Sequence, residues 1–400
     1  MVKILSLLTQ NRVLLLLFIL NILFAFNMNL VTPLQPLFIE NLGANVLEIG
    51  LVISLQGLVS TILMIPSGLF MRKIGEKRML LISSSISMIS LLFYTFSRGW
   101  QELLPWAIMY GSIFSTFIVT RMSIIADHSS TENRATTYGL MNMTWSFGIL
   151  LGPLIAGLLV DTYGWNPLFY LASFISVLSL IPALFLKGDK IIIKESDKKE
   201  DPLLAFDSNP LRVISLFFLM QFAMCAGMGV INITIPLYLI EVFSTSATQV
   251  GLFISVGVGL STLLTQIPSG LIADKFGNKK VMLYCASITA LLYLLAPLIG
   301  NYLLLVVVYM LINASWSMTW PSSVAYLVDS VPKSKRSIAI SIRQTAIRLG
   351  FTIGPLIGGY LWYMYELGTV LSTFPFYISA LFFGLSIPAI LFLKNLKNED

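Results

Sequence analysis

One stretch of the sequence occurs twice, half a chain length apart. Residues 49–83 and 250–285 both contain Gly-Leu near their start, then Ile-Pro-Ser-Gly-Leu, and then a glycine followed closely by a basic pair. Both copies lie in a chain that is apolar almost throughout. A chain that repeats half of itself in this way predicts two similar helical bundles with a binding site between them.

The composition indicates a chain surrounded by lipid. Only 11% of the residues are charged and 56% are hydrophobic, whereas soluble domains carry about 25% charged residues. Apolar runs long enough to cross about 30 Å of hydrocarbon recur from end to end. The predicted fold class is an all-α membrane protein with twelve spans, near residues 13–39, 46–71, 79–97, 102–126, 135–160, 166–186, 211–240, 247–273, 281–299, 302–328, 337–362 and 371–393.

The distribution of charge predicts the topology. Lysine and arginine concentrate in alternate connections, among them residues 72–78, 187–199, 275–280 and 333–336. By the positive-inside rule these connections and both termini face the cytoplasm, which predicts a multi-pass plasma-membrane protein. The polar stretch 188–209 then reads as a cytoplasmic linker between six-helix bundles at residues 1–187 and 210–400.

Several protein classes find no support in the sequence. Cys225 and Cys285 both fall in apolar spans, so they predict neither a disulfide framework nor a metal site. No nucleotide-binding loop or nucleophile elbow occurs, so an enzyme or ATP-driven pump is not expected. We expect no cofactor, and the net charge of +6 is a topology signal rather than a nucleic-acid signal.

Further landmarks repeat at the same offset and make a resemblance specific. The segment from Gly270 to Lys280 is similar to the G-x-x-x-D-R-x-G loop motif of the major facilitator superfamily, and residues 148–157 are similar to its antiporter motif. The chain therefore resembles that superfamily over essentially its full length. The first loop copy departs from the motif, because Arg72 stands where the aspartate belongs. The arginine motif of proton-coupled drug exporters is missing, and Trp106 lies about where its arginine would fall.

The resemblance implies two six-span halves that rock about a central site, with gating residues at the cytoplasmic loops. We expect an asymmetric gate that relies on Asp274, with the loop lysines setting topology. The expected gating set is Asp274, Gly270, Gly277, Arg72, Gly68, Gly75, Asp127, Arg134, Asp329 and Arg336.

Glycines spaced by four, together with a proline, recur in two of the spans. Such glycines share one helix face and let backbones pack closely, while proline permits a bend. Tight packing alone and a sliding seam are equally good interpretations. The residues are Gly148, Gly152, Pro153, Gly157, Gly350, Gly354, Pro355 and Gly359.

Arg348 is the most informative single residue. It lies twelve residues beyond Arg336, hence about 18 Å along the helix and near the bilayer midplane. A charge at that depth is costly and marks a pathway more often than it serves structure alone. Thr345 and Thr352 share its face. Arg343 is assigned instead to the gate or to lipid headgroups, since it lies nearer the cytoplasmic end.

Other polar residues are candidates for the cavity wall. Asn313, Trp316 and Trp320 follow helical spacing, and Thr32 and Gln35 lie in the first span. In the superfamily the corresponding helices line the cavity, although interhelical hydrogen bonding is an equally good reading of any one residue. Arg121 either reaches the cavity or pairs with Asp127 near the cytoplasm.

The deep charges are positive, because no Asp or Glu lies near the middle of any span. This favours a small organic anion bound through charge-assisted hydrogen bonds. We expect a secondary transporter that works by alternating access, either by anion exchange or together with a proton. The rivals are proton-coupled efflux of amphipathic drugs and a membrane receptor without turnover. The expected partners are the solute and the lipid bilayer.

Overall fold

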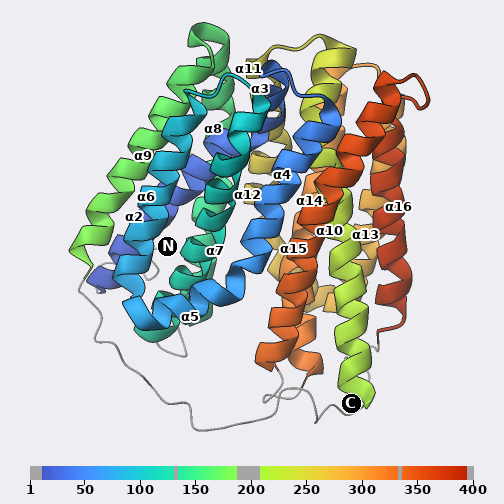
Figure 1. The fold of residues 1–400 in the computed structure, drawn as a ribbon. Coiled ribbons are helices and arrows are strands. Elements are labelled where there is room, and N and C mark those ends of the chain that lie inside the picture. Colours follow the sequence, from blue (N-terminus) through green and yellow to red (C-terminus); the bar gives the residue numbers. More distant parts are fainter. Residues whose placement is uncertain (1–10, 130–133, 187–207, 332–335, 394–400) are drawn as a thin grey trace. The chain divides into compact units, whose positions relative to one another are not determined.

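All regular structure in the described residues is helical (Figure 1). The computed structural model describes residues 11–129, 134–186, 208–331 and 336–393. The first half of the chain forms α2 (Arg12–Val31), η1 (Thr32–Leu34), α3 (Gln35–Asn41), α4 (Val46–Ile62), α5 (Met64–Ile74), α6 (Glu76–Tyr94), η2 (Trp100–Glu102), α7 (Leu103–His128), α8 (Arg134–Tyr163) and α9 (Trp165–Phe185). The second half forms α10 (Ser208–Phe243), α11 (Ala247–Ile254), η3 (Ser255–Leu260), α12 (Ser261–Phe276), α13 (Asn278–Leu295), η4 (Ala296–Leu298), α14 (Tyr302–Ser330), α15 (Arg336–Glu366) and α16 (Phe374–Leu391).

The all-α prediction is confirmed, and each predicted span coincides with one helix or with consecutive helices. Ten helical stretches among the described residues are long and apolar enough to cross a membrane. The pair α4 and α5, bent by 50°, forms an eleventh (Figure 1). The remaining predicted span corresponds to α15, which is outside that set. Arg343, Arg348 and neighbouring polar residues lower the mean hydropathy of this helix.

The chain divides by its internal contacts into two units. The first comprises Met1–Lys194 and Leu239–Ser255, and the second comprises Glu195–Tyr238 and Val256–Asp400. The end of α10 and the whole of α11 therefore pack with the first unit. The boundary at Ser255 coincides with η3, a stretch of π-helix. Such stretches interrupt the regular α-helical ladder and recur at functional positions.

Close backbone contacts hold the first unit together along α2. This helix packs against α8 and α9, and α6 packs against α7 and α9. Gly148 and Gly152 of α8 lie directly on the backbone of α2, where an added Cβ would come within 2.6 Å of the Ala25 carbonyl oxygen and 2.7 Å of the Asn29 carbonyl carbon. Glycine is what allows the two helices to approach this closely.

The second unit repeats this device with α15 and α10. A Cβ added at Gly350 would lie 2.7 Å from Cβ of Cys225, and one at Gly354 would lie 2.5 Å from the Ala226 carbonyl oxygen. Gly358 meets Val230 and Ile233 in the same way, and Gly359 is also buried. The glycine repeat of the sequence thus corresponds to one helix-packing contact in each unit.

The repeated loop also builds the same turn twice. Gly75 follows α5 with φ of 89°, and Gly277 follows α12 with φ of 88°, a backbone region that favours glycine. Shortly after each turn a lysine reaches the end of another helix. Lys77 donates to the Leu184 carbonyl at 2.6 Å, and Lys279 donates to the Leu391 carbonyl at 3.0 Å and also to that of Leu393. These cations satisfy carbonyls at the C-terminal ends of α9 and α16, where the helix dipole is negative.

We therefore predict that Lys279→Ala lowers the stability of the protein. The expected loss is about 0.3–1 kcal/mol, the usual contribution of a cation at a helix C-terminus. Thermal unfolding in detergent measures it. Lys280→Ala is the matched control, because Lys280 carries the same charge in the first turn of the same helix, α13, and is exposed. Equal melting temperatures for the two variants would leave Lys279 with a topological role alone.

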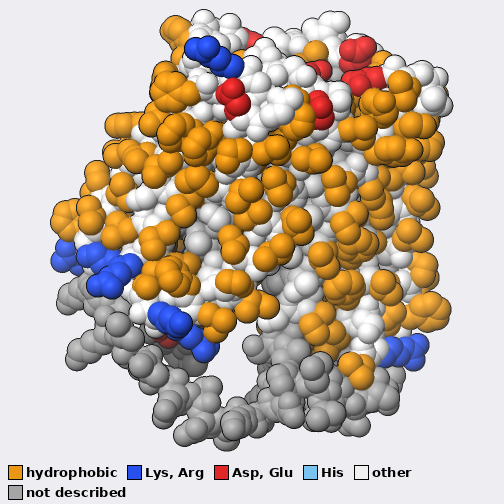
Figure 2. All heavy atoms as spheres, in the orientation of Figure 1, with side chains coloured by type: hydrophobic (Ala, Val, Ile, Leu, Met, Phe, Trp, Pro, Cys, Tyr) orange, Lys and Arg blue, Asp and Glu red, His pale blue; other side chains and the backbone are white. Residues whose placement is uncertain are grey.

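Apolar side chains cover the flanks of the first unit. In Figure 2 hydrophobic groups lie along the middle of its helices, and basic side chains gather at the end where α5 lies. The exposed residues include Ile65, Leu69, Phe174 and Phe185. Apolar exposure of this kind with a basic rim fits a surface that faces lipid and then headgroups.

Candidate functional site

A buried arginine lies against tryptophan in the second unit. Arg343 of α15 is only 3% exposed. Its guanidinium carbon lies 5.2 Å from the ring centroid of Trp320 on α14, and its Nη2 donates to Ser323 Oγ at 3.0 Å. That burial does not fit the headgroup contact suggested by its position along the helix. A guanidinium over an aromatic face is a favourable arrangement, and more so where water is excluded.

Arg348 lies five residues further along α15 and is partly buried. Cys225 of α10 packs against Gly350 of α15, two residues beyond Arg348. Thr352 is buried and donates to the Arg348 carbonyl, whereas Thr345 is exposed and donates to the Ser341 carbonyl. Both hydroxyls are therefore engaged by their own helix.

Two tryptophans of α14 lie beside Arg343. Trp316 and Trp320 meet edge to face, with ring centroids 5.5 Å apart and planes at 85°. Asn313, fully buried, donates to the Tyr309 carbonyl at 2.9 Å. Three buried atoms here meet no hydrogen-bond partner in the described part of the chain: Trp316 Nε1, Asn313 Oδ1 and Arg343 Nε.

Carboxylates of α10, α14 and α15 are confined to the ends of these helices. Across α10, α14 and α15 the sequence has acidic residues only at Glu241, Asp329 and Glu366, each within the last turn of its helix. The arginines of α15 therefore share the middle of these helices with apolar and neutral polar groups. A buried cation in such surroundings favours an anion as its partner.

Arg121 of α7 is the corresponding deep cation of the first unit. It is 6% exposed and donates to Asn21 Oδ1 at 3.1 Å and to Asn142 Oδ1 at 2.8 Å. Asn21 in turn donates to the Met141 carbonyl and to Thr144. Asp127, the other proposed partner, is exposed near the end of the helix. Two neutral side-chain amides therefore hold the Arg121 guanidinium in place.

The two candidates in the first span occupy a separate polar network. Gln35 is buried and donates to the Tyr94 hydroxyl at 3.0 Å, which also accepts from Gln56 at 3.0 Å. Thr32 is exposed and lies 3.4 Å from the Tyr110 hydroxyl. The network joins α3, α4 and α6. The observed contact of Gln35 is therefore a hydrogen bond between helices.

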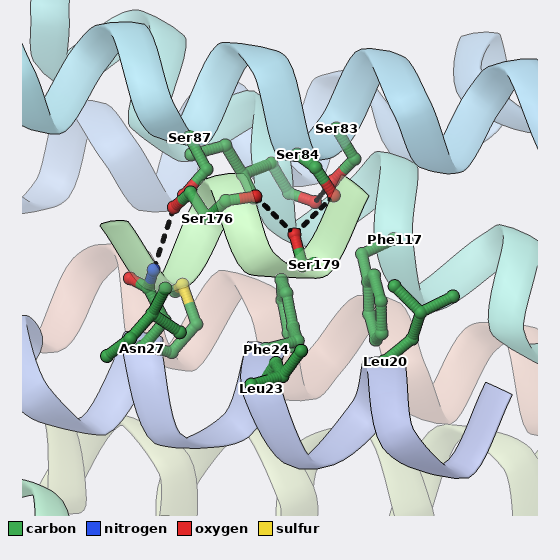
Figure 3. A pocket seen from close by; sticks show the side chains of 13 residues that line it. Leu20, Leu23, Phe24, Asn27, Ser83, Ser84, Ser87, Phe117, Ser176 and Ser179 are labelled. Carbon is green, nitrogen blue, oxygen red and sulfur yellow. Dashed lines mark hydrogen bonds between the residues drawn. The ribbon is translucent and has the colours of Figure 1, made fainter. Parts of the chain in front are cut away.

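A small polar cavity lies inside the first unit, between α2, α6, α7 and α9 (Figure 3). Its volume is about 20 Å³, enough for one water molecule. Asn27 donates to Ser176 Oγ at 2.8 Å, Ser176 meets Ser87 at 2.8 Å, and Ser179 donates to Ser84 at 2.8 Å. These bonds join the helices by small hydroxyls, as in other membrane bundles. The cavity is too small for an organic solute.

The antiporter-like segment of α8 packs against α11 within the first unit. Both carboxylate oxygens of Asp161 accept from the start of α11, from Ala247 N at 3.1 Å and Thr248 N at 2.8 Å. Leu154 N donates to Ser255 Oγ at 3.1 Å. Cβ atoms added at Gly157 or Gly251 would collide with backbone of the facing helix. The acidic cap stabilises the positive end of α11.

The structure describes only part of the expected gating set. Arg72 is exposed at the end of α5, and Gly75 and Gly277 form the two turns. A Cβ added at Gly68 would lie 3.6 Å from Cγ1 of Val119, an ordinary van der Waals contact. The side chains of the remaining acidic and basic members lie outside the described residues, except for exposed Asp127. Those outside are Asp274, Arg134, Asp329 and Arg336, together with the position of Gly270.

The candidate set predicted from the sequence omits three residues of these sites. They are Arg343, which the sequence assigns to the gate or headgroups, and the two acceptors of Arg121, Asn21 and Asn142. Arg343 contacts Ser323 and Trp320 because α15 packs against α14. The position of Arg343 along α15 does not reveal that contact. A polar residue in the middle of an apolar span was the available signal for Asn21.

The fold and its buried arginines define a polytopic membrane transporter. A sequence profile described as the Major Facilitator Superfamily matches residues 17–220 and 217–399. The chain belongs to this superfamily.

Curated relatives and a solved structure agree with this assignment. The chain is 26% identical over 337 residues to an MFS-type transporter of Methanocaldococcus jannaschii, covering 83% of this chain and 86% of the relative. It is 25% identical to the multi-drug resistance efflux pump PmrA of Streptococcus pneumoniae, covering 84% and 86%, and 24% identical to the multidrug resistance protein MdtG of Proteus mirabilis, covering 89% and 90%. The nucleoside transporter NupG shares the fold, with a TM-score of 0.76, 16% identity and coverage of 95% and 98%.

Proposed function

We propose that this protein exports amphipathic organic anions by alternating access. The observation that carries the proposal is the pair of deep arginines on α15, Arg343 and Arg348, in helices whose acidic residues all lie at their ends. Charge-assisted hydrogen bonds from guanidinium groups are strong and suit carboxylate or sulfonate groups. The direction of transport is supported by the two efflux relatives, PmrA and MdtG.

Arg348→Ala tests the anchor directly. Export of octanesulfonate from proteoliposomes should fall about 10- to 100-fold, because a hydrogen bond to a charged group contributes about 1.5–3 kcal/mol. Arg348→Lys should keep part of the flux, since the charge remains while the planar fork is lost. Ser287→Ala is the control, because this hydroxyl on α13 bonds its own helix and lies outside the candidate site. Unchanged octanesulfonate flux in Arg348→Ala would contradict the proposal.

Proton-coupled efflux of amphipathic drugs is the second candidate, and the printed functions of PmrA and MdtG favour it. A transporter of cations usually needs a carboxylate within the membrane to exchange protons against its cargo. Ethidium export that survives Arg348→Ala, with no export of octanesulfonate, would select this candidate instead.

A further inference from the structure

We infer that Arg343, Trp316 and Trp320 form a subsite for planar aromatic acids. The inference rests on the proposed export of organic anions and names the chemical class within it. All three residues belong to α14 and α15 of the second unit. Their contacts are the 5.2 Å approach of Arg343 to Trp320 and the 5.5 Å approach of Trp320 to Trp316.

The first part of the argument concerns hydrogen-bond donors. Arg343 has five N–H donors, and its described bond is the one from Nη2 to Ser323. Its Nε is buried and meets no acceptor in the described residues, and the same is true of the indole Nε1 of Trp316. A buried donor without an acceptor costs about 1–3 kcal/mol. An acidic ligand supplies the acceptor oxygens that such donors need.

The second part concerns aromatic surface. Trp316 and Trp320 are partly buried, so each keeps some accessible surface. Indole rings pair with other rings in edge-to-face or offset geometry and prefer them to aliphatic groups of similar area. A guanidinium beside these rings can bind the carboxylate of a ligand whose aromatic ring packs against the indoles. The pattern of two indoles, one cation and unpaired donors therefore matches an aromatic acid better than an aliphatic one.

Calorimetric titration of the purified protein compares 1-naphthoate, cyclohexanecarboxylate and 1-naphthylmethylamine. We expect 1-naphthoate to bind about 3- to 10-fold more tightly than cyclohexanecarboxylate, which is the usual scale of an aromatic pair. Trp320→Leu should remove this preference, so that the two carboxylates bind with similar affinity. Trp316→Phe keeps a ring but loses the N–H, so it should weaken both carboxylates several-fold.

Trp106→Leu is the matched control, because Trp106 stacks on Phe93 in the other unit. Equal affinities for the two carboxylates, or a preference that persists in Trp320→Leu, would overturn the subsite while leaving anion export standing. Binding of 1-naphthylmethylamine with no binding of either carboxylate would overturn the proposed function as well. Arg343→Lys separates charge from geometry, and we expect it to keep weak carboxylate binding but lose the aromatic preference.

Discussion

Gly251→Val should abolish transport while the protein still assembles in the membrane. A Cβ at this position runs into the carbonyl oxygen of Pro153 on α8. The obstacle is backbone rather than a flexible side chain, so α11 must move away from α8. Overpacking of this kind costs about 1–3 kcal/mol, enough to change a conformational equilibrium about 5- to 150-fold. Octanesulfonate flux in proteoliposomes measures the effect.

The physical reason lies in the contacts that this packing supports. The Asp161 cap on α11 and the bond from Leu154 to Ser255 both need α8 and α11 in close approach. The π-helical stretch η3 follows directly after α11. Gly384→Val is the control, because no atom lies within 4 Å of its added Cβ. Normal flux in Gly251→Val would show that this close approach is dispensable.

Asn21→Leu should strongly destabilise the first unit. The change keeps the volume of the side chain but removes the acceptor of Arg121 Nη1 and the donor to the Met141 carbonyl. Arg121 then stays buried with one fewer partner. Hydrogen bonds to charged groups contribute about 1.5–3 kcal/mol, so we expect a clear drop in melting temperature. Thermal unfolding in detergent is the measurement.

Asn142→Leu and a double variant sharpen this test. Asn142 is exposed whereas Asn21 is fully buried, so we expect the smaller loss for Asn142→Leu. Arg121→Met combined with Asn21→Leu removes the charge together with its partner. Replacing a whole buried polar group by apolar residues is often nearly neutral. If Asn21→Leu were no worse than Asn142→Leu, the amide of Asn21 would not be what holds Arg121.

The internal repeat predicted much of the fold because its residue types act locally. Gly75 and Gly277 specify the same turn, and glycines spaced by four specify close helix contacts in both halves. Apolar length predicted all twelve helical regions, since backbone polar groups in lipid must be satisfied within the helix. These effects depend on few neighbours, so they can be read from linear spacing.

The candidate site was less predictable because it depends on which helices meet. The depth of Arg348 follows from counting along α15, but the burial of Arg343 follows from its contact with α14. In the same way, Asp161 reads as a loop charge until α11 is seen to begin beside it. The separation of two residues in the sequence does not show that their helices pack together. The binding roles of Arg348, Asn313, Trp316 and Arg121 remain predictions.

Counterflow tests the central claim, anion transport along a positively charged path, most directly. Proteoliposomes loaded with unlabelled octanesulfonate are placed in a trace of labelled octanesulfonate, and parallel vesicles are loaded and traced with ethidium. We expect transient accumulation of labelled octanesulfonate above its external concentration, and none of labelled ethidium above that of protein-free vesicles. Accumulation of ethidium without accumulation of octanesulfonate would contradict the account.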